Sequence, residues 1–269
     1  MRCGIFVAPF DELSEPGVLV ELAVRAEAHG WDGIYLWDHI VYRDPVAAVA
    51  DPWIALAAMA AATQRIRLGP LITPPARRRP WKLAREVTTL DRLSAGRVTL
   101  GLGLGSDNSG ELSGFGEELD DRRRAERLEE ALAILEQCWS GQPVRLHGKH
   151  FRIDAKPFAP RPVQAPRPPL WLASRGHARR PMLRAARYDG WFPIELDGPG
   201  QLADGVQAIH AQRGAAGLPD AFDVVVTGAA GEDPGPWREA GATWWLTGFS
   251  LQPGLAEVRA AIDMGPPVT

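Results

Sequence analysis

The chain has 269 residues, of which 45% are hydrophobic and 23% charged, and its formal net charge of −3 gives no reason to expect nucleic acid or an anionic membrane surface as a partner. No apolar run approaches the roughly 20 residues that a membrane-spanning helix needs, and the amino terminus carries no signal-peptide pattern. The two cysteines, Cys3 and Cys138, lie too far apart to form a metal-ligand or disulfide pattern, so we expect a cytoplasmic protein without a metal site.

Short apolar segments typical of buried strands alternate with amphipathic helical segments along the chain. In the first half, strands are predicted at residues 3–7, 33–37, 66–72 and 97–104. Helices are predicted at residues 16–29, 52–62, 80–93 and 120–139. The second of these helices has the clearest start, because Asp51 followed by Pro52 is a strong helix start signal.

The alternation is interrupted between residues 141 and 169. Residues 144–146 and 151–153 have the pattern of a small hairpin, and six prolines between Pro157 and Pro169 form an extended connector. Strands are then predicted at residues 170–173, 189–193, 222–227 and 243–246. The helix predicted after the first of these strands ends at residue 187. The helices after the other three span residues 201–212, 236–240 and 254–262.

Eight strands that alternate with helices predict a parallel sheet, and eight parallel strands close into a barrel. The hairpin and connector could mark a domain linker, but neither side has enough strands to close its own core. We therefore predict that residues 1–269 form one (β/α)8 TIM-barrel domain of the α/β class. The hairpin and the proline-rich segment are then an excursion between the fourth and fifth strands.

The second predicted strand ends in Asp38 and His39. Chemistry in α/β folds collects at the carboxyl ends of the strands, and His39 is the only histidine next to a carboxylate at such a position. These two residues are therefore catalytic candidates. The alternative is that Asp38 only caps the next turn.

A glycine-rich run, Gly101-Leu102-Gly103-Leu104-Gly105-Ser106, closes the fourth strand. It does not match the G-x-G-x-x-G dinucleotide fingerprint, because the third glycine position is occupied by Ser106 and no helix follows directly. The glycines either let a flat ligand lie against the end of the strand or fit a tight corner of the barrel.

Ser174-Arg175-Gly176-His177 precedes a predicted helix, where free backbone N–H groups and the helix dipole suit a phosphate. The alternative is an ordinary helix cap formed by Ser174. The run Arg77-Arg78-Arg79 lies at the rim expected of an active site, although such a run is usually a solvated loop. The chain has no nucleophile elbow, no H-E-x-x-H pair and no G-x-x-x-x-G-K-[ST] loop.

Several of these segments together resemble the bacterial luciferase-like oxidoreductases, a family of flavin-dependent monooxygenases and of enzymes that use the 8-hydroxy-5-deazaflavin coenzyme, coenzyme F420. The resemblance covers most of the chain. It is carried by GWDG at 30–33, WDH at 37–39, IRLGPLITP at 66–74, RP at 79–80, LDRLSAGR at 90–97, GLGLG at 101–105 and RAARYDGW at 184–191.

The resemblance implies a TIM barrel that holds reduced FMN or coenzyme F420 at the carboxyl ends of its strands. It implies catalytic roles for Asp38 and His39, and a non-prolyl cis peptide between Leu71 and Ile72 behind the coenzyme ring. It also implies a phosphate site at the turn from Ser174 to His177. The predicted coenzyme contacts are Asp38, Leu71, Ile72, Thr73, Gly103, Gly105, Ser106, Ser174, Arg175, Gly176 and His177.

We therefore expect an oxidoreductase that performs monooxygenation or hydride transfer on a small organic substrate. Ser106 stands where the sugar-phosphate-oxidising members have a glutamate, so that activity is not expected. The alternative is a flavin-binding barrel without turnover, such as a carrier or sensor. A weaker alternative is a hydrolase or aldolase, although no lysine lies at a strand end to form a Schiff base.

Two further expectations concern surfaces. The resemblance implies a homodimer, and the alanines at 57, 58, 60 and 61 offer a small-residue surface for close helix approach, unless they simply pack on the barrel. Trp37, Trp53, Trp191 and Trp245 are candidates for an apolar wall of the site, with core packing as the alternative for each.

Overall fold

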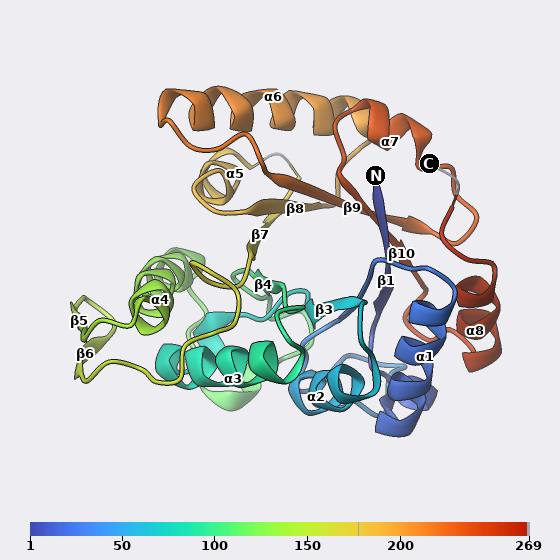
Figure 1. Ribbon diagram of the computed structural model, residues 1–269, viewed down its shortest axis with the longest axis horizontal. Helices are drawn as coiled ribbons and strands as arrows, with labels where there is room; N and C mark the ends of the chain where they lie inside the picture. The colour runs from blue at the N-terminus through green and yellow to red at the C-terminus, as the bar shows by residue number, and fades with distance from the viewer. Residues whose placement is uncertain (177, 268–269) are drawn as a thin grey trace.

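The strands and helices alternate around a parallel barrel, as the sequence predicts (Figure 1). In this computed structural model, which describes residues 1–176 and 178–267, eight strands are ordered β3-β2-β1-β10-β9-β8-β7-β4. Parallel bridges from Leu68 to Val98 and from Thr73 to Leu102 join the outer strands β3 and β4. The sheet therefore closes on itself, and the predicted (β/α)8 fold is confirmed.

The barrel strands are β1 (Arg2–Val7), β2 (Gly33–Leu36), β3 (Arg67–Pro70), β4 (Leu100–Leu102), β7 (Leu170–Arg175), β8 (Gly190–Ile194), β9 (Asp223–Ala229) and β10 (Trp244–Gly248). The helices are α1 (Pro16–Ala28), α2 (Pro52–Ala62), α3 (Pro80–Leu93), α4 (Asp121–Ser140), α5 (Arg179–Ala185), α6 (Pro199–Ala215), α7 (Gly235–Glu239) and α8 (Leu255–Asp263). Most bounds agree with the sequence prediction, but β4 is shorter because residues 97–99 meet β3 only through the Val98 bridge.

Apolar side chains fill the barrel on both sides of the sheet. Inside, Tyr35, Trp171 and Trp244 pack as a group, with ring centroids 5.1–5.9 Å apart. Outside, Trp191 and Trp245 are buried in the layer between strands and helices, so core packing is the role of these two tryptophans. The barrel interior is thus a packed core, and space for a ligand remains only toward its ends.

The predicted hairpin is present as β5 (Val144–His147) and β6 (Arg152–Ala155), an antiparallel pair beyond α4 (Figure 1). The Glu130 carboxylate on α4 accepts hydrogen bonds from the backbone N–H groups of Lys149, His150 and Phe151 at 2.7–3.2 Å. The connector is held in the same way: Asp91 accepts from the backbone of Val163 and Gln164. Both parts of the excursion are therefore attached to the outer helices, away from the barrel mouth.

The end of the barrel that carries the strand amino termini is held by Arg97. Its guanidinium donates to the backbone oxygens of Ala60, Thr63, Ile66 and Ser94 at 2.7–2.9 Å, and to the Thr63 hydroxyl at 2.8 Å. The residue is only 9% exposed, so these acceptors have little access to water. One side chain thus joins the carboxyl ends of α2 and α3 to the start of β3.

We expect Arg97→Met to lower the free energy of unfolding by about 3 kcal/mol, because several buried acceptors lose a charged donor. Urea unfolding measures this, with Arg92→Met as the matched control, since Arg92 is exposed and makes one bond to Arg161 O at 3.2 Å. An equal, small loss in both variants would contradict the assigned role of Arg97.

Candidate active site

A cavity of about 610 Å³ opens at the carboxyl ends of the barrel strands. Its wall includes side chains from the ends of β1, β2, β7 and β8 and from the loops that follow β2, β3 and β4. The structure brings these sequence-predicted residues to it: Asp38, His39, Leu71, Ile72, Gly103, Gly105, Ser106, Ser174 and Arg175. Thr73 and Gly176 are not part of the cavity wall, and His177 lies outside the described residues.

The Asp38 carboxylate is the centre of a buried polar cluster. It accepts hydrogen bonds from Thr73 Oγ1 at 2.6 Å, Trp53 Nε1 at 3.1 Å and Arg78 Nη2 at 2.9 Å. Arg77 Nη2 adds bonds to the Asp38 backbone oxygen at 2.6 Å and to its carboxylate at 3.3 Å. The side chain is only 1% exposed, so Asp38 orders the residues behind the cavity and does not cap a turn.

Glu111 is the functional-site residue that sequence reasoning missed. It lies in the polar loop after β4, and its side chain is 4% exposed. Its Oε2 is 2.6 Å from His39 Nδ1, while its Oε1 accepts from the Ile40 backbone N–H at 2.6 Å and from Arg77 Nη1. The sequence does contain one signal for Glu111, an acidic residue in a short polar loop at a strand end. That signal does not reveal that its partner is His39.

The surroundings of Glu111 determine its protonation state and that of His39 Nδ1. Burial alone would raise the pKa of Glu111, but the hydrogen bond and charge of His39, the Ile40 N–H and Arg77 outweigh it, so the pKa lies below its ordinary value. Glu111 is therefore a carboxylate, which can only accept hydrogen bonds. It follows that His39 Nδ1 carries the hydrogen, and Nε2 is the ring nitrogen left to exchange a proton with a ligand.

Aromatic rings surround His39 and hold its orientation. The centroids of Phe10, Trp37 and Tyr42 lie 5.8, 5.7 and 4.8 Å from the imidazole centroid. The His39 side chain is 21% exposed, and both it and Trp37 line the cavity. Trp53, by contrast, is 7% exposed and donates to Asp38, so its role is in the polar cluster.

The peptide bond between Leu71 and Ile72 is cis, so this prediction is confirmed. The glycines of the fourth strand pack against this segment. An added Cβ would lie 2.5 Å from a Leu71 side-chain atom at Gly101, and 2.9 Å from an Ile72 side-chain atom at Gly103. At Gly101 the added Cβ would also lie 2.7 Å from the Pro70 backbone oxygen, so close packing requires glycine there. Gly103 and Gly105 line the cavity, and their contact with a flat ligand stays a prediction. No α-helix follows the run until α4.

The turn after β7 is built differently from the sequence expectation. The Gly176 N–H donates to the Ile194 carbonyl at 2.7 Å, and the Ala178 N–H to the Arg175 carbonyl at 3.2 Å. Ser174 does not cap α5, because its hydroxyl accepts from Trp191 Nε1 at 2.8 Å and donates to the Gly176 carbonyl. These two backbone N–H groups are therefore already used. Among the described side chains of the turn, the half-exposed Arg175 guanidinium can meet an anion, and it pairs with Glu195 at 2.5 Å.

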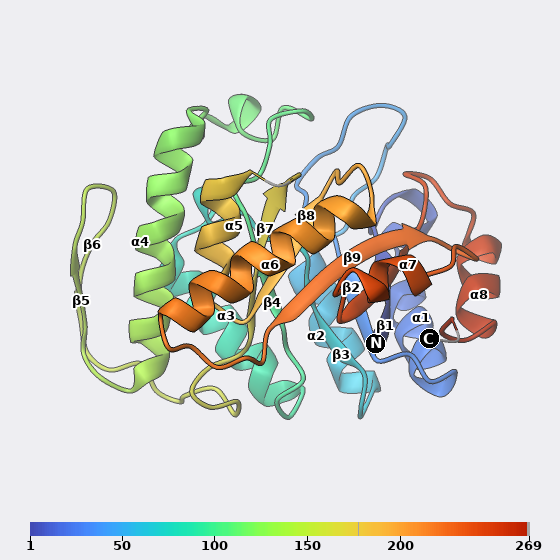
Figure 2. The ribbon, with the colours of Figure 1, turned by 90° about the horizontal axis from the view of Figure 1, so that it is seen from above.

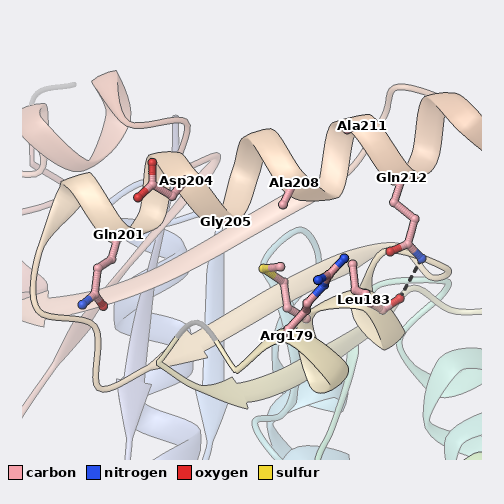
Figure 3. Close-up of a pocket in the computed structure, with 9 residues that line it drawn as sticks. Arg179, Leu183, Gln201, Asp204, Gly205, Ala208, Ala211 and Gln212 are labelled. Atoms are coloured by element: carbon pink, nitrogen blue, oxygen red, sulfur yellow. Dashed lines mark hydrogen bonds between the residues drawn. The ribbon is translucent and has the colours of Figure 1, made fainter.

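A second cavity, of about 670 Å³, lies outside the barrel between α5 and α6 (Figure 3). Figure 3 shows Gln212 extending from α6 toward α5, where its Nε2 donates to the Leu183 carbonyl at 3.0 Å. None of the sequence-predicted residues that the structure describes lines it. We therefore assign the candidate active site to the cavity at the barrel mouth.

Within residues 1–176 and 178–267, no group of three or more His, Cys, Asp or Glu side chains is arranged to hold a metal ion. Over the same residues, no helix has the length and apolar character to cross a membrane.

Comparison with known proteins matches residues 1–232 to the model of a family described as luciferase-like monooxygenase. An uncharacterized protein of Mycobacterium tuberculosis is 30% identical over 258 residues, which are 88% of this chain and 89% of that protein. The F420-dependent hydroxymycolic acid dehydrogenase of M. tuberculosis is 30% identical over 273 residues, which are 98% of this chain and 73% of the relative.

Solved structures share the fold. An F420-dependent secondary alcohol dehydrogenase in complex with an F420–acetone adduct superposes with a TM-score of 0.82 at 21% identity, covering 97% of this chain and 96% of the other. A monooxygenase from Streptomyces bottropensis gives 0.81 at 18% identity, with the same coverage of 97% and 96%.

We expect Glu111→Gln to lower the free energy of unfolding by about 2 kcal/mol at pH 7, because the carboxylate that pairs with the charged Arg77 and accepts from His39 is replaced by a neutral amide. A glutamate in the unfolded chain titrates near pH 4.3. The pKa of Glu111 in the folded protein is lower. The carboxylate therefore contributes fully to the free energy of unfolding above about pH 5, and this contribution is lost as the pH falls from there through the folded pKa.

Urea unfolding at pH 7, 5 and 3.5 measures this difference between wild type and variant. Glu117→Gln, in the same loop, is the control, because no ion pair or side-chain hydrogen bond of Glu117 occurs among the described residues. A gap that stays constant down to pH 3.5 would mean that the charge of Glu111 does not stabilise the fold.

Proposed function

Because the chain belongs to the luciferase-like monooxygenase family, we propose that it is an oxidoreductase in which coenzyme F420 binds at the barrel mouth and a small alcohol or ketone is the substrate. The observation that carries the proposal is the His39–Glu111 pair, which presents one imidazole nitrogen to the cavity. The F420-dependent dehydrogenase that is 30% identical over 98% of this chain supports this choice of coenzyme. FMN, the coenzyme used by other family members, is the alternative that the experiment below tests.

The residues of the cavity fit a flavin-type group. Leu71, Ile72 and Ala173 give an apolar surface for a flat ring, and Ser106 and Ser174 give hydroxyl groups beside it. Arg175 is the residue that we assign to a phosphate on the coenzyme, through its side chain and not through the Gly176 N–H. Thr73 donates to Asp38, and Asp38 in turn holds Arg77 and Arg78 in place behind the ring site.

The coenzyme, when bound, supplies or accepts the hydride. The proton that must accompany the hydride is the task of this chain, and we assign it to His39 Nε2. In ketone reduction this nitrogen gives the proton to the carbonyl oxygen while a C–H bond forms at the carbonyl carbon, and in alcohol oxidation it takes the proton back. Glu111 acts as a positioning residue, because it fixes the tautomer and the orientation of the imidazole.

We expect His39→Asn to reduce the rate of single-turnover hydride transfer with coenzyme F420 at least about 100-fold, because general acid catalysis contributes that much and asparagine has no group that takes up a proton. Its amide nitrogen can still donate to Glu111, so the melting temperature and the coenzyme affinity stay close to wild type. His210→Ala on the outer helix α6 is the matched control.

Fluorescence titration under anaerobic conditions compares coenzyme F420 with FMN. Tighter binding of FMN would move the proposal to flavin chemistry. If neither coenzyme binds, the proposed function is wrong, and a protein that binds a coenzyme but transfers no hydride to any alcohol or ketone would be a carrier instead.

We also propose a homodimer formed through the outer face of α2. Ile54 is 71% exposed, and Ala58 and Ala61 are exposed on the same face at helical spacing. Ala60, in contrast, is buried and packs on the barrel. An exposed isoleucine beside small residues lets a second helix approach closely.

We expect wild-type protein to have twice the chain mass of 29.3 kDa by light scattering, and Ile54→Arg to have the monomer mass, because a buried arginine would lack a partner. Met264→Arg, at another exposed apolar residue, should leave the mass unchanged. A monomeric wild type at micromolar concentration would refute the proposed dimer.

A further inference from the structure

The charged groups at the cavity are already paired with one another. Asp38 is bound by Arg77 and Arg78, and Glu111 by His39 and Arg77. Arg175 pairs with Glu195, as described above. Within the described wall of the cavity, Arg43 on the exposed rim is the one cation without a carboxylate partner, and it lies over the Tyr42 ring. A charged substrate group that does not pair with Arg43 on the rim would therefore have to displace an existing ion pair.

Part of the remaining wall is neutral and polar, with Ser106, Asn108, Ser109 and Thr227. Its apolar part is formed by Phe6, Trp37, Ile72, Leu104, Phe192 and Ile194. Phe6 packs against both Trp37 and Phe192, with centroids 5.6 and 5.8 Å apart, so this wall is continuous across β1, β2 and β8. A neutral, apolar substrate body matches this surface.

Exposed apolar side chains lie on two loops that also supply residues to the cavity wall. Ile40 and Val41, in the loop after β2, are 49% and 38% exposed, and Phe115 and Leu119, in the loop after β4, are 54% and 52% exposed. Figure 2 shows both loops projecting from the same end of the barrel, and the bond from Ile40 N to Glu111 ties them together. We call these four residues the apolar collar.

The position of the collar ties it to the cavity. Ile40 and Val41 lie beside the wall residues His39 and Tyr42 in sequence, while Phe115 and Leu119 follow Leu112 and precede Asp121, which also line the cavity. Four of the nine large hydrophobic residues exposed on the described surface thus lie on the two loops that supply these wall residues. Concentrated apolar exposure marks a binding surface, and here it adjoins the candidate active site.

We propose that the collar binds the hydrocarbon chain of the substrate, and that the substrate class is a neutral long-chain ketone or secondary alcohol. The identity of the reacting group, a ketone or secondary alcohol, rests on the proposed function. The binding of a hydrocarbon chain by the collar does not. The carbonyl end lies in the cavity near His39, and the part of the chain that the cavity cannot enclose lies over Ile40, Val41, Phe115 and Leu119.

Calorimetric binding of butanone, octan-2-one and dodecan-2-one to the protein tests the collar. It is measured without coenzyme and again with oxidised coenzyme F420, which cannot reduce a ketone. In wild type we expect the affinity to rise about twofold to fourfold per methylene from octan-2-one to dodecan-2-one, the range between half and full burial of each group. Binding without coenzyme keeps this test independent of whether the proposed reaction is correct.

The double variant Phe115→Ser with Leu119→Ser should lose the gain beyond octan-2-one and keep the wild-type affinity for butanone. Leu93→Ser is the matched control, because Leu93 is 49% exposed at the end of α3, at the opposite end of the barrel. Ile40→Ser repeats the test on the other loop, in case the double variant does not fold.

Affinity that does not increase with chain length in wild type, or that increases equally in the collar variants, would overturn the proposal. So would a collar variant that keeps wild-type ketone binding but changes the mass in light scattering or the binding to phosphatidylcholine vesicles. In those cases the collar would be a contact for a second copy or for a lipid surface.

Discussion

The candidate site depends on the pairing of two buried carboxylates with one shared arginine, Arg77. Asp38 and Glu111 come from different loops, and Arg77, from a third, contacts both. Buried charges are costly unless each is paired, so none of the three loops can move without leaving a charge alone in the protein interior. The same cluster orients His39. The Glu111 carboxylate determines which imidazole nitrogen carries hydrogen, and three aromatic side chains hold the plane of the imidazole.

The fold could be predicted from the sequence because its determinants are local. Apolar strands, helix start signals and their alternation lie within short windows, and they identified all eight barrel strands and the hairpin. The positions of Asp38 and His39 followed from the same reasoning, since parallel strands present their carboxyl ends together. Leu71 and Ile72 needed the family resemblance, because nothing in the local sequence indicates a cis bond.

The contacts within the site could not be predicted because they join loops that are far apart in sequence. Glu111 is 72 residues from His39, and neither position belongs to a periodic pattern. The turn after β7 illustrates the same limit: a small-residue turn before a helix suggested free N–H groups, but the neighbouring strand β8 supplies the Ile194 carbonyl that takes one of them. For the glycine run, sequence left two interpretations, and only the position of the Pro70–Leu71 segment shows that Gly101 is required by close packing.

A crystal structure of the protein grown with coenzyme F420 tests whether the coenzyme binds at the barrel mouth beside His39. We expect the tricyclic ring in the barrel-mouth cavity, in contact with Ile72, with the Nε2 side of the His39 imidazole facing the space beside it and the Glu111 bond intact. A ring bound between α5 and α6, or a ring at the barrel mouth with His39 turned away from the cavity, would contradict it.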